Sequence, residues 1–98
     1  MLHIINKSPL ANSALDSCLR VVGNGDILLI EDAVYAATSG SAMEATMREA
    51  MKHLKVHVLQ PDLDARGMAD HVIDGVNSID YAGFVDLVAQ SKNCQSWL

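Results

Sequence analysis

A short polar segment, Pro61–Gly67, is the first candidate for chemistry in this 98-residue chain. It carries Asp62, Asp64 and Arg66 directly after residues 55–60, which the apolar pattern predicts to be a buried strand. In an open α/β sheet, ligands bind just beyond the carboxyl ends of the strands. The segment contains no cysteine, serine or histidine, so it offers carboxylates and a guanidinium but no nucleophile.

Cys18 is the candidate nucleophile of the chain, because a thiolate can attack or carry sulfur. It lies in an apolar helical stripe that consists of Leu15, Cys18, Leu19 and Val22. Burial in such a stripe raises the pKa of a thiol and makes it inert, so the residues alone favour a structural cysteine. Cys94 lies in a polar tail without a local base, and we interpret it as an incidental thiol. Two cysteines at this spacing fit neither a disulfide framework nor a zinc motif.

The acidic pair Glu31 and Asp32 ends another predicted strand. Acidic pairs at such a place bind magnesium in phosphate-receiving signalling domains, where an aspartate after the next strand accepts the phosphate. Asp62 can imitate that aspartate, but the lysine that these domains need falls in the tail, at Lys92, rather than after a strand. We therefore favour a strand-end cap beside a solvated carboxylate, and a receiver domain stays an alternative.

The remaining candidate ligands do not form a pattern. The histidines at positions 3, 53, 57 and 71 are scattered over several elements, so we predict no metal site. Gly23-Asn24-Gly25 follows a helix and precedes a strand, the reverse of a phosphate loop, and we predict no cofactor. We expect His3 and His57 to be core or edge residues of adjacent strands.

These candidates are positioned by strands that alternate with helices. Strands are expected at residues 2–6, 26–31, 55–60 and 76–79. The apolar end of the tail, residues 92–98, is expected to dock as an edge strand or to contact another subunit. Because such alternation implies parallel strands and right-handed crossovers, the predicted fold is α/β. It is a three-layer α/β/α domain over residues 1–98, with a mainly parallel sheet of four to five strands.

Polar residues mark the expected starts of the helices. Ser13 with Asp16, and Ser41 with Glu44, are spaced as capping boxes. Asp32 and Asp80 are expected to cap a brief helix at 33–37 and the last helix. A short helical turn is expected at 62–68. Two apolar stripes are expected on helices, Met43, Met47, Ala50, Met51 and Leu54 on one and Tyr81, Phe84, Val85 and Val88 on the last.

Composition limits the classes of function. Half of the residues are hydrophobic, which is enough for a core, and burial against a partner chain would add to it. The net charge of −5 repels phosphate backbones, so we expect no direct nucleic-acid binding. No apolar run is long enough to span a membrane, and the N-terminus lacks the pattern of a signal peptide. We expect a protein of the reducing cytoplasm.

Five segments, in order along nearly the whole chain, resemble the TusB/DsrH family of small sulfur-relay proteins. They are Met1–His3 with Asn6–Pro9, Glu31–Ala37, Asp62–Gly67, Ile79–Leu87 and Ser96–Leu98. Within Glu31–Ala37, Ala33 stands where the family pattern has glycine. Ser17-Cys18-Leu19, Gly83 and the final Trp97-Leu98 are similar to the DsrH branch in particular.

The resemblance implies a parallel DsrEFH-like sheet flanked by helices and a heterohexamer of three related subunits, two copies of each. The partners would be DsrE/TusD-like and DsrF/TusC-like subunits, and a sulfur carrier of the TusE/DsrC type would act through the complex. One sister subunit carries the active cysteine and passes persulfide sulfur onward. The sulfur serves 2-thiouridine formation in tRNA in TusB-type complexes, and sulfur oxidation in DsrH-type complexes.

The chain departs from the sister subunit at the active position. Ala65-Arg66-Gly67 matches the end of the sister's motif. The segment that leads into this motif here, residues 59–62, has no cysteine. We therefore expect an accessory, mainly non-catalytic subunit of a sulfurtransferase complex. Cys18 matches a cysteine of DsrH-like chains, so the alternative is a self-sufficient sulfurtransferase that carries persulfide on Cys18.

Overall fold

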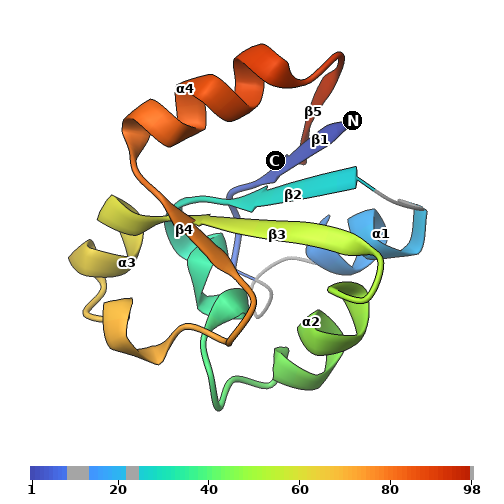
Figure 1. Cartoon of the computed structure of the whole chain (residues 1–98). Helices are drawn as coiled ribbons and strands as arrows, with labels where there is room; N and C mark the ends of the chain where they lie inside the picture. The colour runs from blue at the N-terminus through green and yellow to red at the C-terminus, as the bar shows by residue number, and fades with distance from the viewer. Residues whose placement is uncertain (9–13, 22–24, 98) are drawn as a thin grey trace.

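The apolar segments of the sequence form the three central strands of a five-stranded sheet (Figure 1). The computed structural model describes residues 1–8, 14–21 and 25–97. The strands are β1 (Leu2–Ile5), β2 (Gly25–Leu29), β3 (Leu54–Leu59), β4 (Asn77–Ile79) and β5 (Cys94–Trp97). Their order is β4-β3-β2-β1-β5, and every neighbouring pair is parallel. The predicted parallel sheet is confirmed, and the tail forms its edge strand β5.

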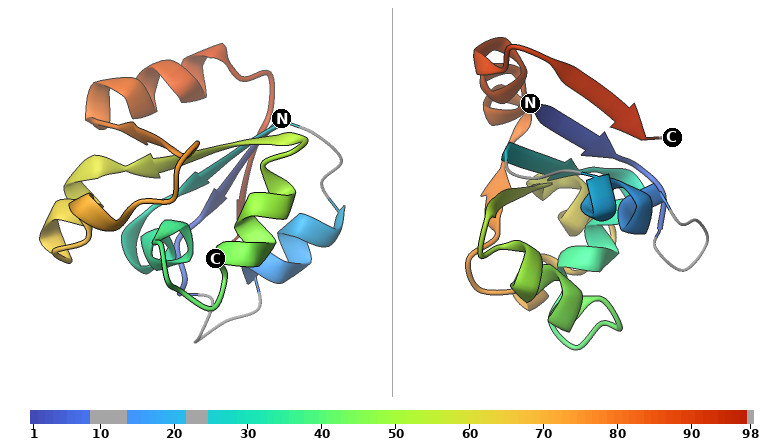
Figure 2. Two further views of the ribbon diagram at one scale, coloured as in Figure 1. Left: turned by 60° about the horizontal axis from the view of Figure 1, so that its bottom comes forward. Right: turned by 90° about the vertical axis from the view of Figure 1, so that its right-hand side faces the viewer.

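The helices lie on both faces of the sheet, as the three-layer prediction requires (Figures 1 and 2). Helices α1 (Ala14–Val21) and α2 (Glu44–Ala50) cover one face together with the 3-10 helix η1 (Glu31–Ala37). Helix α4 (Tyr81–Gln90) lies on the opposite face. Helix α3 (Gln60–Ala65) and the 3-10 turn η2 (Ala69–His71) follow the carboxyl end of β3. None of the helices in the described part of the chain has the length and apolar character of a membrane span.

The main core lies between the sheet and the layer of α1, α2 and η1. Alternate residues of the central strands point into it, among them Ile5, Ile27, Leu29, Val56 and Val58. The neighbouring residues Leu2, Leu28 and Leu59 point to the α4 side and are also buried. Strand β2 is therefore buried on both faces, as its unbroken aliphatic run predicts.

Two predicted helix caps differ from the observed ones. Asp32 does not cap η1, since its carboxylate is held by Arg66 and Ile30 occupies the N-cap position without a side-chain bond. Helix α2 begins at Glu44, and the Glu44 carboxylate accepts the N–H of Gly40 (2.6 Å) instead of that of Ser41. The turn before α2 thus displaces the capping contact by one residue. Asp80 caps α4 as predicted, because its Oδ1 accepts the N–H of Gly83 (2.8 Å).

Two further expectations were wrong in detail. Tyr81 and Val85 do not face the sheet, because α4 turns the side with Phe84 and Val88 toward it. Gly83 permits this close approach, since a Cβ there would lie 3.0 Å from the Cβ of Ile79. His3 and His57 are buried but not on adjacent strands, because β2 lies between β1 and β3. The expected cap Ser13 lies outside the described residues, as do residues 22–24 of the expected first helix end and turn.

Candidate functional site

The carboxyl ends of β2 and β3 bring the acidic pair and the Pro61–Gly67 segment together. Glu31 and Asp32 begin η1, which is anchored because its alanines and Val34 are fully buried. Asp62 lies in the first turn of α3, which is anchored by the buried Leu63. The backbone N–H of Glu31 donates to Oδ2 of Asp62 (2.6 Å). The structure therefore joins the two segments that the sequence analysis singled out separately.

Arg66 completes this corner. Its Nε and Nη2 both donate to Oδ1 of Asp32, at 3.0 and 2.8 Å, and its Nη1 donates to the carbonyl oxygen of Asp62 at 3.1 Å. We call Glu31, Asp32, Asp62 and Arg66 the strand-end clasp. Glu31 has a φ of 52°, a left-handed conformation that costs a non-glycine residue about 1–2 kcal/mol. This conformation accompanies the bond from the Glu31 N–H to Asp62.

The side chains of Asp32, Asp62 and Arg66 bind other groups of the clasp, so few reactive groups are left for a substrate. The guanidinium of Arg66 is occupied by two partners, Asp62 accepts a backbone N–H, and none of the four residues carries a thiol or hydroxyl. No group of three or more metal-ligating side chains is present in the described part of the chain. Lys92 precedes β5 and so lies at the amino edge of the parallel sheet, opposite the clasp. This geometry argues against a phosphate-receiving site.

Cys18 lies in the main core rather than at the clasp. Its exposed fraction is 0%, and burial raises the pKa of its thiol to about 11 from 9.0. The thiolate that sulfur transfer needs is therefore disfavoured in this conformation. Cys94 is exposed and begins β5 at the amino edge of the sheet, so the two thiols and the clasp occupy different regions. A sulfur-handling role of Cys18 stays a prediction.

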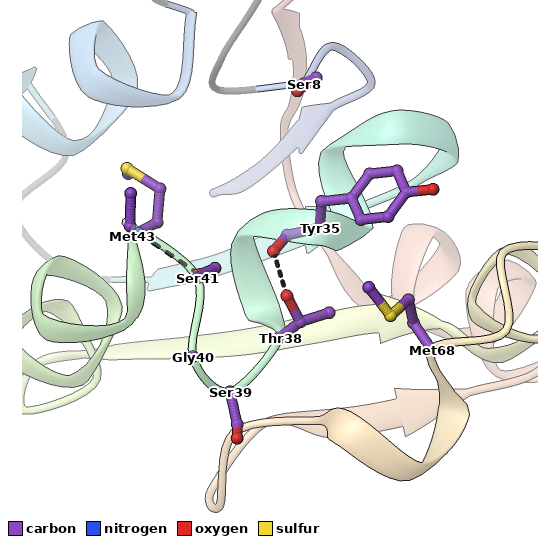
Figure 3. A pocket seen from close by; sticks show the side chains of 9 residues that line it. Ser8, Tyr35, Thr38, Ser39, Gly40, Ser41, Met43 and Met68 are labelled. Carbon is purple, nitrogen blue, oxygen red and sulfur yellow. Dashed lines mark hydrogen bonds between the residues drawn. The ribbon is translucent and has the colours of Figure 1, made fainter.

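A cavity of about 450 Å³ opens beside η1 and was missed by the sequence analysis (Figure 3). Its described lining combines serine and threonine hydroxyls with Tyr35 and two methionines, Met43 and Met68. Thr38 Oγ1 donates to the carbonyl oxygen of Tyr35 (2.7 Å), and Ser41 Oγ accepts the N–H of Met43 (3.3 Å). No charged side chain or thiol belongs to that described lining. The only sequence pattern at this cavity is the run of small residues Thr38–Ser41, and such a run is typical of an ordinary turn.

Two histidine contacts were also missed, because they depend on the strand register. His57 Nε2 lies 2.7 Å from Asp26 Oδ2 across β2 and β3, while the buried Nδ1 of His57 has no partner among the described residues. Trp97 Nε1 donates to Nδ1 of His3 (3.1 Å) and fastens β5 to β1. Burial and the positive N-terminus lower the pKa of His3 below 6.5. We interpret the His57–Asp26 and Trp97–His3 contacts as structural, because each one joins two neighbouring strands.

Comparisons with known proteins agree with the fold and the motifs. The family model of the DsrH-like proteins matches residues 7–94. TusB of Pectobacterium parmentieri is 37% identical over 98 residues, which cover 99% of this chain and 100% of the relative. TusB of Escherichia coli O81 (strain ED1a) is 35% identical over 98 residues, with the same coverage.

Two solved structures share the fold. The ychN protein of E. coli superposes with a TM-score of 0.81 at 19% identity and covers 97% of each chain. MTH1491 of Methanobacterium thermoautotrophicum superposes with a TM-score of 0.75 at 15% identity, covering 97% of this chain and 95% of that one. At these identities the likeness concerns the fold alone.

Proposed function

The chain belongs to the TusB/DsrH family, and on this premise we propose that it is an accessory, non-catalytic subunit of a cytoplasmic sulfur-relay complex. In this proposal residues 1–98 act as one DsrH/TusB-like domain. The observation that carries the proposal is the clasp. At the strand end where the family resemblance puts a sister subunit's active cysteine, this chain has Asp62 and Arg66 bound to their own neighbours.

The chemistry of the relay would then belong to a partner. In persulfide transfer, the accepting thiolate attacks the outer sulfur of the donor, the S–S bond breaks, and the donor leaves as a thiolate. This step needs an accessible thiolate, and Cys18 is fully buried with a raised pKa. The role of this chain is to complete the assembly and to shape the sister's site.

The partners in this proposal are the DsrE/TusD-like and DsrF/TusC-like subunits, two copies of each with two of this chain. A TusE/DsrC-type carrier takes the sulfur from the complex. The net charge of −5 supports indirect rather than direct contact with tRNA. The destination of the sulfur is 2-thiouridine in tRNA or a pathway of sulfur oxidation.

The test is persulfide labelling of the isolated chain and of the reconstituted complex. Both are incubated with a persulfide donor and analysed by mass spectrometry of the intact subunits, with Cys18→Ala as the matched variant. We expect the mass of an added sulfur on a sister subunit, and none at Cys18 of this chain, as located by peptide mass spectrometry. Complexes with Cys18→Ala should label the sister as the wild type does.

The alternative of a self-sufficient sulfurtransferase gives the opposite result. It requires that the isolated wild-type chain gains sulfur at Cys18 and that Cys18→Ala abolishes the gain. That outcome would replace the accessory role with catalysis on this chain.

A further inference from the structure

Helix α4 presents an apolar stripe to solvent. Tyr81 and Val85 are 62% and 64% exposed, and Ala82 and Ala89 are exposed beside them. Residues four apart lie on one side of a helix, so Tyr81, Val85 and Ala89 form a continuous line. No residue of α4 is fully buried, although the leucines of the sheet behind it are. We call Tyr81, Ala82, Val85 and Ala89 the α4 stripe.

The charged residues of helix α4 and of its cap are acidic. Asp80 and Asp86 are the charged residues between positions 80 and 90, and no lysine or arginine occurs there. Two copies of the chain that paired through their α4 helices would bring these carboxylates together, in molecules that each carry a net charge of −5. A face bordered by lysine or arginine would instead be complementary.

The size of the stripe indicates a folded partner. A ten-residue helix is about 15 Å long, so its exposed face alone is smaller than the area of about 800 Å² that a stable interface buries on each partner. The partner must therefore reach beyond α4. The edge strand β5 offers such an extension, because Cys94 and Ser96 are exposed and, by their register with Leu2 and Ile4, point to the same face of the sheet as α4.

We propose that the α4 stripe docks one of the related subunits of the complex, through an apolar surface bordered by basic side chains. This inference rests on the proposed function, since it names the surface through which the accessory subunit joins the assembly. The stripe supplies apolar burial, and Asp86 supplies the charge that selects the partner over a second copy of this chain.

The test compares Val85→Glu with Ala45→Glu, which adds the same charge at an exposed position of α2 in the opposite layer. Each variant is coexpressed with the two related subunits of its organism, and assembly is measured by affinity purification and light scattering. We expect Val85→Glu to weaken assembly on the order of tenfold or more, and Ala45→Glu to leave it unchanged. Tyr81→Glu repeats the test one turn away, and circular dichroism of each isolated variant checks its fold.

A second arm tests the charge. Asp86→Lys is expected to weaken assembly, and the loss should shrink as the salt concentration rises. The docking proposal is overturned if the wild type assembles and the folded Val85→Glu and Tyr81→Glu variants assemble equally well. Failure of the wild type to bind either subunit overturns the proposed function and the docking surface together. Dimerisation of the isolated chain that Val85→Glu abolishes would show a second copy to be the occupant, and would also refute the proposal.

Discussion

Cys18 shows how position within one helix determines the reactivity of a thiol. The apolar stripe around it predicts burial, and the structure gives it no exposed surface. With a pKa of about 11 in place of 9.0, the thiolate fraction falls about hundredfold at neutral pH. Cys94, with the same side chain, lies exposed on β5. The same functional group is therefore protected at one position and available at the other.

This contrast predicts selective alkylation. In the native chain, iodoacetamide should modify Cys94 readily and Cys18 only after a denaturant unfolds the core, because buried thiols react through opening of the structure. Peptide mass spectrometry over time gives the rate at each site. Cys94→Ser should leave the native protein almost unreactive, whereas Cys18→Ala should react as the wild type does. Equal native rates at the two cysteines would show that Cys18 is accessible.

The bond from Trp97 to His3 predicts a dependence of stability on pH. His3 must be neutral to accept this bond at Nδ1, and its pKa in the folded chain is lowered below 6.5. Above pH 6.5 both folded and unfolded chains hold His3 neutral, so the full stability is present. As the pH falls below 6.5, the unfolded chain gains the proton first, and the free energy of unfolding decreases down to the lowered pKa.

The measurement is urea unfolding at a series of pH values, monitored by fluorescence of Trp97, which is the single tryptophan. His3→Gln keeps a polar side chain but cannot take up a proton, so it should show a weaker loss of stability in the acidic range. The other three histidines are present in both proteins, so the difference between the two curves isolates His3. Identical curves for the two proteins would contradict the prediction.

At the scale of elements, sequence patterns predicted the strands and helices but not the side-chain contacts between distant elements. Asp80 was predicted as a cap because an aspartate before an apolar helical run has a local partner, the N–H of Gly83. Asp32 has the same local pattern, yet Arg66 competes for it from 34 positions away. His57 and Asp26 also meet only through the register of β3 on β2. Contacts made by distant residues leave no periodic signal in the sequence.

The clasp predicts a modest stabilising effect. Asp62→Ala removes the acceptor of the Glu31 N–H, while Glu31 keeps its left-handed conformation. Because the site is exposed and water can replace the acceptor, we expect a loss of about 0.5–1.5 kcal/mol in the free energy of unfolding. Asp62→Asn retains an acceptor oxygen and should lose less. The free energies come from urea unfolding of the three proteins. A loss above about 3 kcal/mol would mean that Asp62 stabilises the fold by more than one exposed hydrogen bond.

For the whole molecule, the fold was predictable because the central strands β1, β2 and β3 are rich in apolar residues and a helix lies in each crossover. What periodicity did not predict is the asymmetry of the two helical layers. One face of the sheet is covered by α1, α2 and η1 over a continuous core, and the other has α4 with no fully buried residue. A four-residue apolar stripe indicates a helix but does not specify which of its apolar side chains meet the sheet, as Tyr81 and Val85 show.

This asymmetry predicts an uneven distribution of local stability. Amides of β2 and its neighbours β1 and β3 should exchange with deuterium most slowly, because these strands are hydrogen-bonded on both sides and mostly buried. Amides of α4 and the edge strand β5 should exchange faster, since no residue of either element is fully buried. Exchange measured by mass spectrometry on the isolated chain, and again with the related subunits present, separates the fold from the assembly. In the assembled state the exchange of α4 amides should become slower, while that of β2 amides changes little. If α4 amides already exchange as slowly as β2 amides in the isolated chain, the α4 layer needs no partner to be stable.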